Sequence, residues 1–339
     1  MLPALSRIRR NIRITRRRAL QGSVVMAVVG GLLLWWLLPV GESAPGGRLT
    51  FSTGVKTGVY QRYGELLQNV LARDLPEVSI DLRTSEGSQQ NLARVANGEA
   101  DFTIATADAV AKYQRESRPG ADRLRGCARL YDDYVQLVVP QDSPARKPAD
   151  LRGKRVGVGQ DGSGVRIIAD RVLSAAGLDP VKDVEPVSAG IDTMPGRLER
   201  GELDAFFWSG GLPTNAVQKL SERFAIRLVP LDKLLIDRVH DAGGATRYYR
   251  SAVVPADAYP HIMGGAVQVE TLAVTNLLVT TDRAESELTE SFTRAVIDSR
   301  DRIGQEVHPA QLVDLRTAIY TDPLQLHEGA RRYYRSVKP

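Results

Sequence analysis

The stretch that decides the fold is RLTFSTGVKTGVYQRYGELLQNVLARDL, residues 48–75. Alternating apolar residues over 49–53 predict a short strand, which runs into a loop containing Gly54 and Gly58. A helix is predicted next, because apolar side chains then recur at helical spacing. Strand, glycine loop and helix form a unit in which free N–H groups at the helix start can bind an anion. The alternative interpretation of this stretch, taken alone, is an ordinary βα turn.

The same alternation continues as two series of strands and helices. In the first series, strands are predicted at 78–83, 101–106, 124–130 and 134–139, and helices at 89–96 and 107–115. In the second, strands are predicted at 154–159, 184–187 and from 205, and helices at 165–176 and 194–200. Each series places the pattern G-E-x-D between a helix and a strand, at 98–101 and at 201–204. This repetition predicts two lobes of like architecture.

The last third of the chain predicts how the lobes are connected. Residues 212–270 are less regular, and the β-prone run 271–280 is followed by predicted helices at 282–303, 309–320 and 326–337. We therefore expect lobe I to contain residues 48–139 and 272–339, and lobe II to contain residues 140–271. The predicted fold class is α/β, a two-lobed type II periplasmic binding protein fold. Each lobe is an open, mainly parallel sheet flanked by helices, and two hinge strands join the lobes.

The N-terminal residues read as an export or anchor segment. Residues 1–23 form a basic arm with seven arginines, residues 24–40 are uncharged and apolar, and residues 41–47 form a linker. A basic arm before an apolar run predicts export, with the arginines on the cytoplasmic side. The 17 residues are just long enough to span a bilayer, so we favour an uncleaved anchor over a cleaved signal peptide. The predicted location is the outer face of the cytoplasmic membrane.

Charge and cysteine content exclude several classes of protein. The formal net charge is +5, but seven of the 45 Lys and Arg residues precede the first acidic residue, Glu42. The rest of the chain therefore carries 38 basic and 40 acidic side chains, which gives no support to nucleic-acid binding. Cys127 is the only cysteine, so the exported body has no internal disulfide and depends on its hydrophobic core.

The sequence offers little for an enzyme. The four histidines are scattered without metal-ligand spacing, and neither the P-loop motif G-x-x-x-x-G-K-[ST] nor the motif G-x-S-x-G is present. Residues 157–162, GVGQDG, fit G-x-G-x-x-G, but no clear acidic partner follows on a later strand. We predict no catalytic residue, no metal and no cofactor.

Several motifs resemble, in order, those of the TAXI family, the solute receptors of one class of TRAP transporters. They are STGVKTGVY at 52–60, TSEGSQQNL at 84–92, GEADF at 98–102, DLRGKRV at 150–156, GSG at 162–164, DAFF at 204–207 and PLQLHEGARRYY at 323–334. The resemblance implies a receptor that closes on a small solute and delivers it to a TRAP-type permease. It implies a glutamate-like amino acid or another small carboxylate as ligand. Lys56 in the first loop and ATAD at 105–108 depart from the family pattern and bear on the ligand's identity.

The candidate site lies where loops at the carboxyl ends of strands converge. The predicted ligand-binding residues are Thr53, Gly54, Thr57, Gly58, Tyr60, Ser88, Asn91 and Asp108 from lobe I, and Gln160, Gly162, Ser163, Gly164 and Ser209 from lobe II. Helix starts would bind a carboxylate, and Asp108 would accept a ligand ammonium group. Ser88 and Ser163 could instead be simple helix caps. Trp208 is either the end of a core strand or a wall of the cleft.

Two other classes of function remain open from the sequence. The same lobes could serve a membrane-anchored ligand sensor or interaction protein, for which a short cytoplasmic arm is suitable. They could also carry an enzyme, which turnover of a bound solute would reveal. The predicted partners are a small anionic or zwitterionic solute, a TRAP-type permease and the cytoplasmic membrane.

Overall fold

The computed structural model describes residues 46–262 and 268–337. Residues 45–339 form one compact unit by their contacts. The predicted basic arm, the apolar segment 24–40 and most of the linker lie outside the described residues. Within the described ranges, no helix has both the length and the apolar character needed to cross a membrane.

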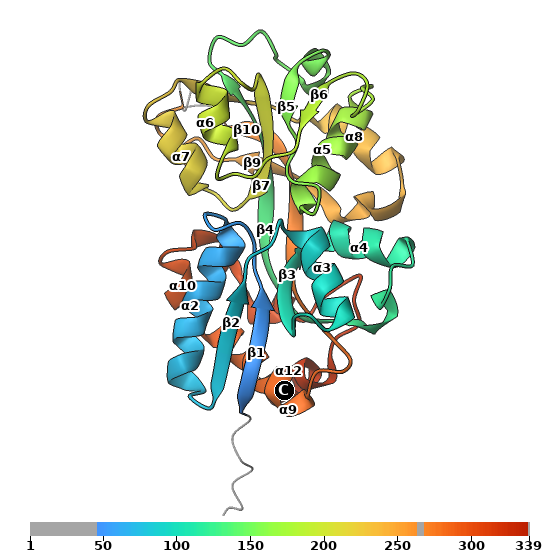
Figure 1. The fold of residues 1–339 in the computed structure, drawn as a ribbon, viewed down its shortest axis with the longest axis vertical. Helices are drawn as coiled ribbons and strands as arrows, with labels where there is room; N and C mark the ends of the chain where they lie inside the picture. The colour runs from blue at the N-terminus through green and yellow to red at the C-terminus, as the bar shows by residue number, and fades with distance from the viewer. Residues whose placement is uncertain (1–45, 263–267, 338–339) are drawn as a thin grey trace, which may run out of the picture. The chain divides into compact units, whose positions relative to one another are not determined.

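Strands and helices alternate along most of the chain (Figure 1). The strands are β1 (Gly47–Ser52), β2 (Val78–Arg83), β3 (Phe102–Thr106), β4 (Leu124–Pro140), β5 (Arg155–Gly157), β6 (Glu185–Val187), β7 (Ala205–Gly210), β8 (Ile226–Val229), β9 (Tyr249–Val254) and β10 (Val269–Thr281). The α-helices are α2 (Val59–Asp74), α3 (Ser88–Asn97), α4 (Ala107–Arg115), α5 (Gly164–Ala175), α6 (Met194–Glu199), α7 (Asn215–Ser221), α8 (Lys233–Asp241), α9 (Ser286–Asp298), α10 (Arg300–Gly304), α11 (Leu315–Ala318) and α12 (Glu328–Val337). Short 3-10 helices are η1 (Ala121–Arg123), η2 (Pro148–Leu151), η3 (Gly244–Tyr248) and η4 (His308–Leu312).

The strands form two groups with the same order. In lobe I the order is β2-β1-β3-β10-β4, with β1 parallel to β2 and β3 and with β10 antiparallel to β3 and β4. In lobe II the order is β6-β5-β7-β4-β8, again with three parallel strands beside an antiparallel one. Helices α2–α4 and α9–α12 pack in lobe I, and α5–α8 in lobe II (Figure 1). The predicted α/β, type II periplasmic binding protein fold is confirmed.

Two long strands, β4 and β10, pass through both groups and make the hydrogen-bonded sheet continuous. The first part of β4 pairs with β10 in lobe I, and the part from Tyr134 onward pairs with β7 and β8 in lobe II. The start of β10, opposite the end of this first part, pairs with β9. Asp133, opposite Val274 of β10, therefore lies where β4 crosses from one lobe to the other.

The repeated G-E-x-D pattern forms the same backbone contact in each lobe. Asp101 accepts the backbone N–H of Thr50 in β1 at 2.7 Å, and its own N–H donates to the Thr50 carbonyl at 2.8 Å. Asp204 makes the same pair of bonds with Arg155 in β5, at 2.8 Å and 2.9 Å. The glycine of each pattern has a positive φ, 79° at Gly98 and 68° at Gly201, which suits the end of a helix. The sequence repeat therefore forms the same pair of hydrogen bonds between a helix-to-strand turn and a neighbouring strand in both lobes.

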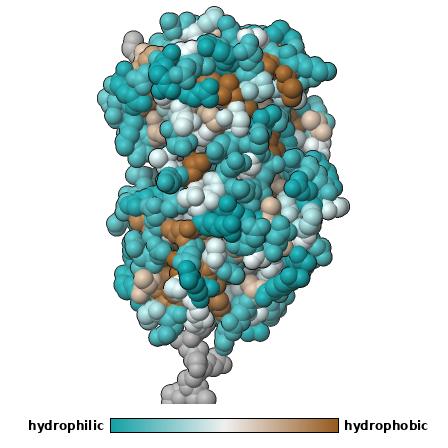
Figure 2. Space-filling view, viewed as in Figure 1, coloured by the Kyte–Doolittle hydropathy of each residue, from teal (hydrophilic) through white to brown (hydrophobic). Residues whose placement is uncertain are grey.

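Each lobe has its own hydrophobic core. In lobe I, the rings of Phe102 and Phe292 stack with centroids 4.2 Å apart, and Phe51 packs beside them. In lobe II, the core packs β5 and β7 against α5 and α8, with Phe207 fully buried. Figure 2 shows that the surface of the face in view is mainly hydrophilic, with scattered apolar patches.

Several predicted elements differ from the structure. The strands expected at 124–130 and 134–139 are one strand, β4, because Asp132 between them is satisfied by Thr275 at 2.7 Å and by an ion pair with Arg250. The helix expected at 282–303 starts at Ser286 and breaks at Ser299, and the helix expected at 309–320 is divided into the 3-10 helix η4 and the one-turn helix α11. In the region expected to be less regular, 212–270, the described residues form two α-helices, the 3-10 helix η3, the strands β8 and β9, and the start of β10.

Candidate functional site

A cavity lies between the lobes, beside the point where β4 crosses. Its lobe I lining consists of Gly54, Val55, Gly58, Val59, Tyr60, Glu86, Gly87, Ser88, Thr106 and Asp133. Its lobe II lining consists of Gly159, Gln160, Ser163, Gly164, Val165, Ala189, Gly190, Trp208, Ser209 and Gly210. The centre of a water molecule can reach ≈ 60 Å³ of it. At about 10–15 Å³ per water by this measure, the cavity suits a ligand of modest size.

Four helices begin at this cavity: α2 after Gly58, α3 after Gly87, α4 after Thr106 and α5 after Ser163. Only Ser163 caps its helix with its side chain, by accepting the Arg166 N–H at 3.1 Å. The first N–H groups of a helix lack partners within the helix, and its dipole is positive at this end. The cavity wall is therefore rich in donors and suited to an anionic group.

Four polar atoms in the lining are buried and have no hydrogen-bond partner in the described structure: Thr106 Oγ1, Asp133 Oδ1, Gln160 Oε1 and Ser209 Oγ. The Thr106, Asp133 and Ser209 residues are 2%, 4% and 7% exposed. Buried polar groups are normally paired, so a cluster of unpaired ones needs a reason. Two of these residues come from each side of the cavity, which is the arrangement that a ligand held by both lobes requires.

Asp133 has the most strongly perturbed carboxyl group of this cavity. Burial raises its pKa to about 7, and the negative charges of Asp132 and Asp108 act in the same direction. The Asn276 amide opposes this shift by favouring the charged carboxylate. Asn276 is itself oriented by Tyr60, whose hydroxyl donates to its Oδ1 at 2.5 Å and lies 3.3 Å from Ser88 Oγ. A network of protein side chains thus positions the groups around Asp133.

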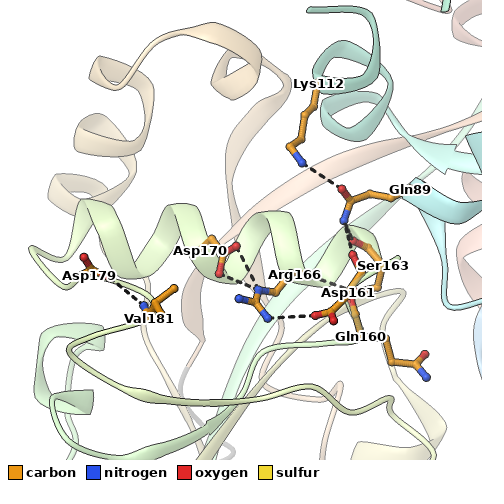
Figure 3. A network of polar contacts seen from close by, with 9 residues as sticks. All are labelled: Gln89, Lys112, Gln160, Asp161, Ser163, Arg166, Asp170, Asp179 and Val181. Carbon is orange, nitrogen blue, oxygen red and sulfur yellow. Dashed lines mark hydrogen bonds and ion pairs between the residues drawn. The ribbon is translucent and has the colours of Figure 1, made fainter. Parts of the chain in front are cut away.

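The two lobes contact each other at the edge of the cavity. Glu86 Oε2 accepts the backbone N–H of Gly162 at 2.8 Å, and the Gly162 carbonyl accepts the N–H of Gln90 at 3.0 Å. Figure 3 shows Gln89 lying between Lys112 and the loop that precedes α5. Its amide nitrogen donates to the carbonyls of Asp161 and Ser163, at 2.9 Å and 2.8 Å. Backbone groups make most of these contacts on the lobe II side.

Gly87 lies at a close approach between the lobes. Its φ is 131°, a conformation that L-residues with side chains rarely adopt. A Cβ atom at this position would lie 3.2 Å from the Cα of Ser163. A side chain at residue 87 would strain the backbone and require Ser163 to move by a few tenths of an ångström, so glycine suits the place where the starts of α3 and α5 meet.

Eight of the thirteen predicted site residues line the cavity: Gly54, Gly58, Tyr60, Ser88, Gln160, Ser163, Gly164 and Ser209. The helix starts that the sequence predicts are thus brought together. Their contact with a ligand stays a prediction. Trp208, which the sequence left open, also lines the cavity, and its indole N–H donates to Thr214 at 3.2 Å.

The other five predicted residues lie outside the lining. Thr53 and Asn91 are fully buried, and the Asn91 amide bonds the Thr53 and Ile104 carbonyls, so it joins strands of the core. Thr57 is exposed in a turn, because residues 55–58 form a tight bend before α2. Gly162 contacts Glu86 and Gln90 instead. Asp108 faces away, toward other partners.

Asp108 is bound by lobe II side chains. Its Oδ2 accepts the Tyr249 hydroxyl at 2.7 Å and lies 3.4 Å from the Arg171 guanidinium. The predicted role of accepting a ligand ammonium group therefore does not fit Asp108. Asp133, which sequence reasoning missed, lies in the cavity. Its signal was present, since an acidic residue inside a long apolar strand needs an explanation.

Thr106 and Glu86 were also missed as lining residues. Thr106 is the last residue of the buried strand β3 and the N-cap of α4, so it lies at the carboxyl end of a strand, where the other predicted loops supply their polar groups. In the described ranges, no group of three or more His, Cys, Asp or Glu residues could hold a metal ion.

The comparisons with known proteins concern nearly all of the described chain. Similar solved structures include a putative L-cystine ABC transporter protein from Listeria monocytogenes, 14% identical, covering 79% of this chain and 98% of that one, with a TM-score of 0.49. The periplasmic aliphatic sulphonate binding protein from Escherichia coli is 16% identical, with coverages of 87% and 84% and a TM-score of 0.45. An ancestral arginine-binding protein bound to arginine is 17% identical, with coverages of 77% and 98% and a TM-score of 0.48.

Residues 51–337 match the NMT1-like family. The match spans both lobes and all the cavity-lining residues. It agrees with the prediction of a solute-binding protein and not an enzyme. The chain belongs to the NMT1-like family.

Proposed function

We propose that this protein is an extracytoplasmic solute receptor that captures a small anionic or zwitterionic solute between its lobes. The observation that supports this most directly is the interlobe cavity, in which buried polar atoms of both lobes lack partners. A solute that bonds to Gln160 and Ser209 on one side and to Thr106 on the other gains contacts that no single lobe provides. Such a solute shifts the population toward the form in which the lobes touch.

The mechanism we propose uses β4 and β10 as the hinge. Residues 48–139 with 272–339 would move as lobe I, and residues 140–271 as lobe II. The strand order of each lobe and the separate cores support two bodies that can each keep their packing during such a motion. The edge contacts at Gly162 are hydrogen bonds, which can break and reform.

The partner we propose is a membrane permease that recognises the ligand-bound form. The sequence motifs that resemble TAXI receptors favour a permease of the TRAP type. The N-terminal apolar segment would tether the receptor to the outer face of the cytoplasmic membrane. Energy for uptake would come from the permease and its ion gradient, not from this chain.

Isothermal titration calorimetry of the full chain in detergent tests the proposal. The panel comprises amino acids, mono- and dicarboxylates and neutral sugars, and thermal unfolding with each compound provides the second readout. A true ligand at a hundredfold excess over Kd is expected to stabilise the fold by about 2.7 kcal/mol. Ser209→Ala with Thr106→Ala should weaken binding, whereas Ser251→Ala, at an exposed position of β9, should not. A well-folded chain that binds nothing in the panel would contradict the proposed receptor function.

A further inference from the structure

The charges that line the cavity are all negative. Asp133 and Glu86 are its two ionisable carboxyl groups, and no Arg, Lys or His side chain belongs to the described lining. Glu86 is exposed at the edge, where it bonds Gly162, but Asp133 is buried against the crossing strands. A ligand with two carboxylates would bring two further negative charges to these groups. A ligand with a positively charged group would offset the Asp133 charge instead.

Asp133 lacks the protein partner that a buried carboxylate normally has. Its Oδ1 has no hydrogen bond in the described structure, and Asn276 is the side chain that favours its charged form. Tyr60 holds Asn276 in place, so the protein orients this region without neutralising it. The group that fits here is a donor with a positive charge, small enough to enter the cavity.

The helix starts at the cavity favour a negatively charged group of the ligand, whereas Asp133 favours a positively charged one. Thr106, 2% exposed, has an unpartnered Oγ1 at the N-cap position of α4, and Ser88 Oγ lies beside it, accepting the Thr106 N–H at 3.2 Å. Gly164, at the start of α5, faces both, because a Cβ there would lie 3.1 Å from Ser88 Oγ and 3.2 Å from Thr106 Oγ1. Donors from α3, α4 and α5 therefore meet at one place, which suits one carboxylate.

Resting on the proposed receptor function, we propose that the ligand is a zwitterion with one carboxylate and one ammonium group, an α-amino acid with a small uncharged side chain. Asp133 accepts the ammonium group, and the helix starts around Thr106 bind the carboxylate. The apolar surfaces of Val55, Ala189 and Trp208 remain for the side chain. Dicarboxylates and simple carboxylic acids are poor ligands, which departs from the carboxylate class implied by the sequence resemblance.

The experiment compares each uncharged L-α-amino acid with its deamino analogue, using calorimetry on the full chain in detergent at pH 8. L-alanine is paired with propionate and L-valine with isovalerate, and succinate and glutarate complete the set. At least one amino acid is expected to bind at least 100-fold more tightly than its deamino analogue and than either dicarboxylate. A dicarboxylate or a deamino acid that binds as well as the amino acids would overturn this assignment of the ligand but not the proposed receptor function. No binding by any compound of the wider panel would overturn both.

Asp133→Asn supplies the decisive variant, with Asp301→Asn on α10 as the matched control, because Asp301 is an exposed carboxylate outside the lining. Asp133→Asn is expected to lose at least 100-fold in affinity for the amino acid while its affinity for the deamino analogue stays the same or rises. Loss of both affinities to the same extent would mean that Asp133 only maintains the cavity, and the assignment would fail. Thermal unfolding of each variant shows that it is folded.

Discussion

Two buried carboxylates between the lobes, Asp108 and Asp133, have different surroundings. Asp108 is fully buried, but its Oδ2 accepts the Tyr249 hydroxyl and faces the Arg171 guanidinium. Asp133 is 4% exposed and has only the Asn276 amide in support of its charge. The protein therefore supplies a hydroxyl and a cation to Asp108 Oδ2, although Asp108 Oδ1, like Asp133 Oδ1, has no hydrogen-bond partner in the described structure. Asp133 has the surroundings of a contact that a ligand completes.

The comparison teaches how a binding site can be distinguished from a structural ion pair. Both carboxylates are near the crossing strands, and burial penalises the charge of both. The protein supplies a cation for Asp108 from α5 and places no cation beside Asp133 in the described lining. Three substitutions test this difference, and they are given in order of decreasing expected effect.

The largest effect is expected from Arg171→Met, which removes the cation from Asp108 and keeps the apolar stem. Breaking a buried pair on one side typically costs 3–5 kcal/mol. Because the Tyr249 hydroxyl remains on Asp108, we expect a loss of about 3 kcal/mol in the free energy of unfolding, measured by urea denaturation. Arg238→Met, at an exposed position of α8, is the control and should change stability by less than about 0.5 kcal/mol. A loss no larger than that of the control would mean that Arg171 does not stabilise Asp108.

In the absence of ligand, Asp133→Asn is expected to raise the free energy of unfolding at pH 8, whereas Arg171→Met lowers it. Burial raises the pKa of Asp133 to about 7, so the folded chain holds this proton more strongly than the unfolded chain does. Stability from this group is therefore present at low pH and falls as the pH rises from about 4 to about 7. That interval corresponds to about 4 kcal/mol at 1.36 kcal/mol per pH unit, and the unpaired Asn amide offsets part of it.

We therefore expect Asp133→Asn to be more stable than the native chain by about 2 kcal/mol at pH 8 and less stable than it by about 2 kcal/mol at pH 4, where the native carboxyl is protonated and only the cost of the Asn amide remains. Urea denaturation at both pH values measures this difference, with Asp301→Asn as the control. Asp108, Asp132, Tyr60 and Tyr131 are the titratable groups that interact with Asp133, and all four are retained in the variant. Equal stability differences at pH 4 and pH 8 would show that Asp133 does not titrate in this range.

The smallest effect is expected from Glu86→Ala at the exposed edge of the cavity. This change removes the hydrogen bond to the Gly162 N–H but leaves no buried charge behind. Exposed contacts contribute about 1 kcal/mol or less, so ligand affinity should fall by about fivefold at most. Glu222→Ala, at an exposed position after α7, is the control. A loss beyond tenfold by calorimetry would place Glu86 in contact with the ligand.

Most of the fold could be predicted from the sequence because its signals are local. The strand, glycine loop and helix at 48–75 form as expected, and the repeated G-E-x-D pattern marks equivalent hydrogen-bonded turns at Asp101 and Asp204. The single strand β4 could not be predicted, because Asp132 looks like an interruption until Thr275 and Arg250 are placed beside it.

The site was predictable at its helix starts and much less so elsewhere. Gly58, Ser88 and Gly164 line the cavity because a strand-to-helix loop always ends at the same edge of a parallel sheet. The sequence could not show that Asn91 turns toward the core or that Asp108 meets Tyr249, since these depend on long-range packing. Asp133 stands out in the sequence as an acidic residue among apolar ones, but its place in the cavity follows only from the crossing of β4 between the lobes.

The missing side chain at Gly87 has a practical consequence. Because a Cβ there would press on the backbone at Ser163, an alanine would act as a wedge between the lobes. We expect a receptor with that alanine to fold each lobe and to close less readily, because Ser163 must move by a few tenths of an ångström to admit the Cβ. With such a chain, the response of a membrane partner to the empty receptor could be separated from its response to the loaded one.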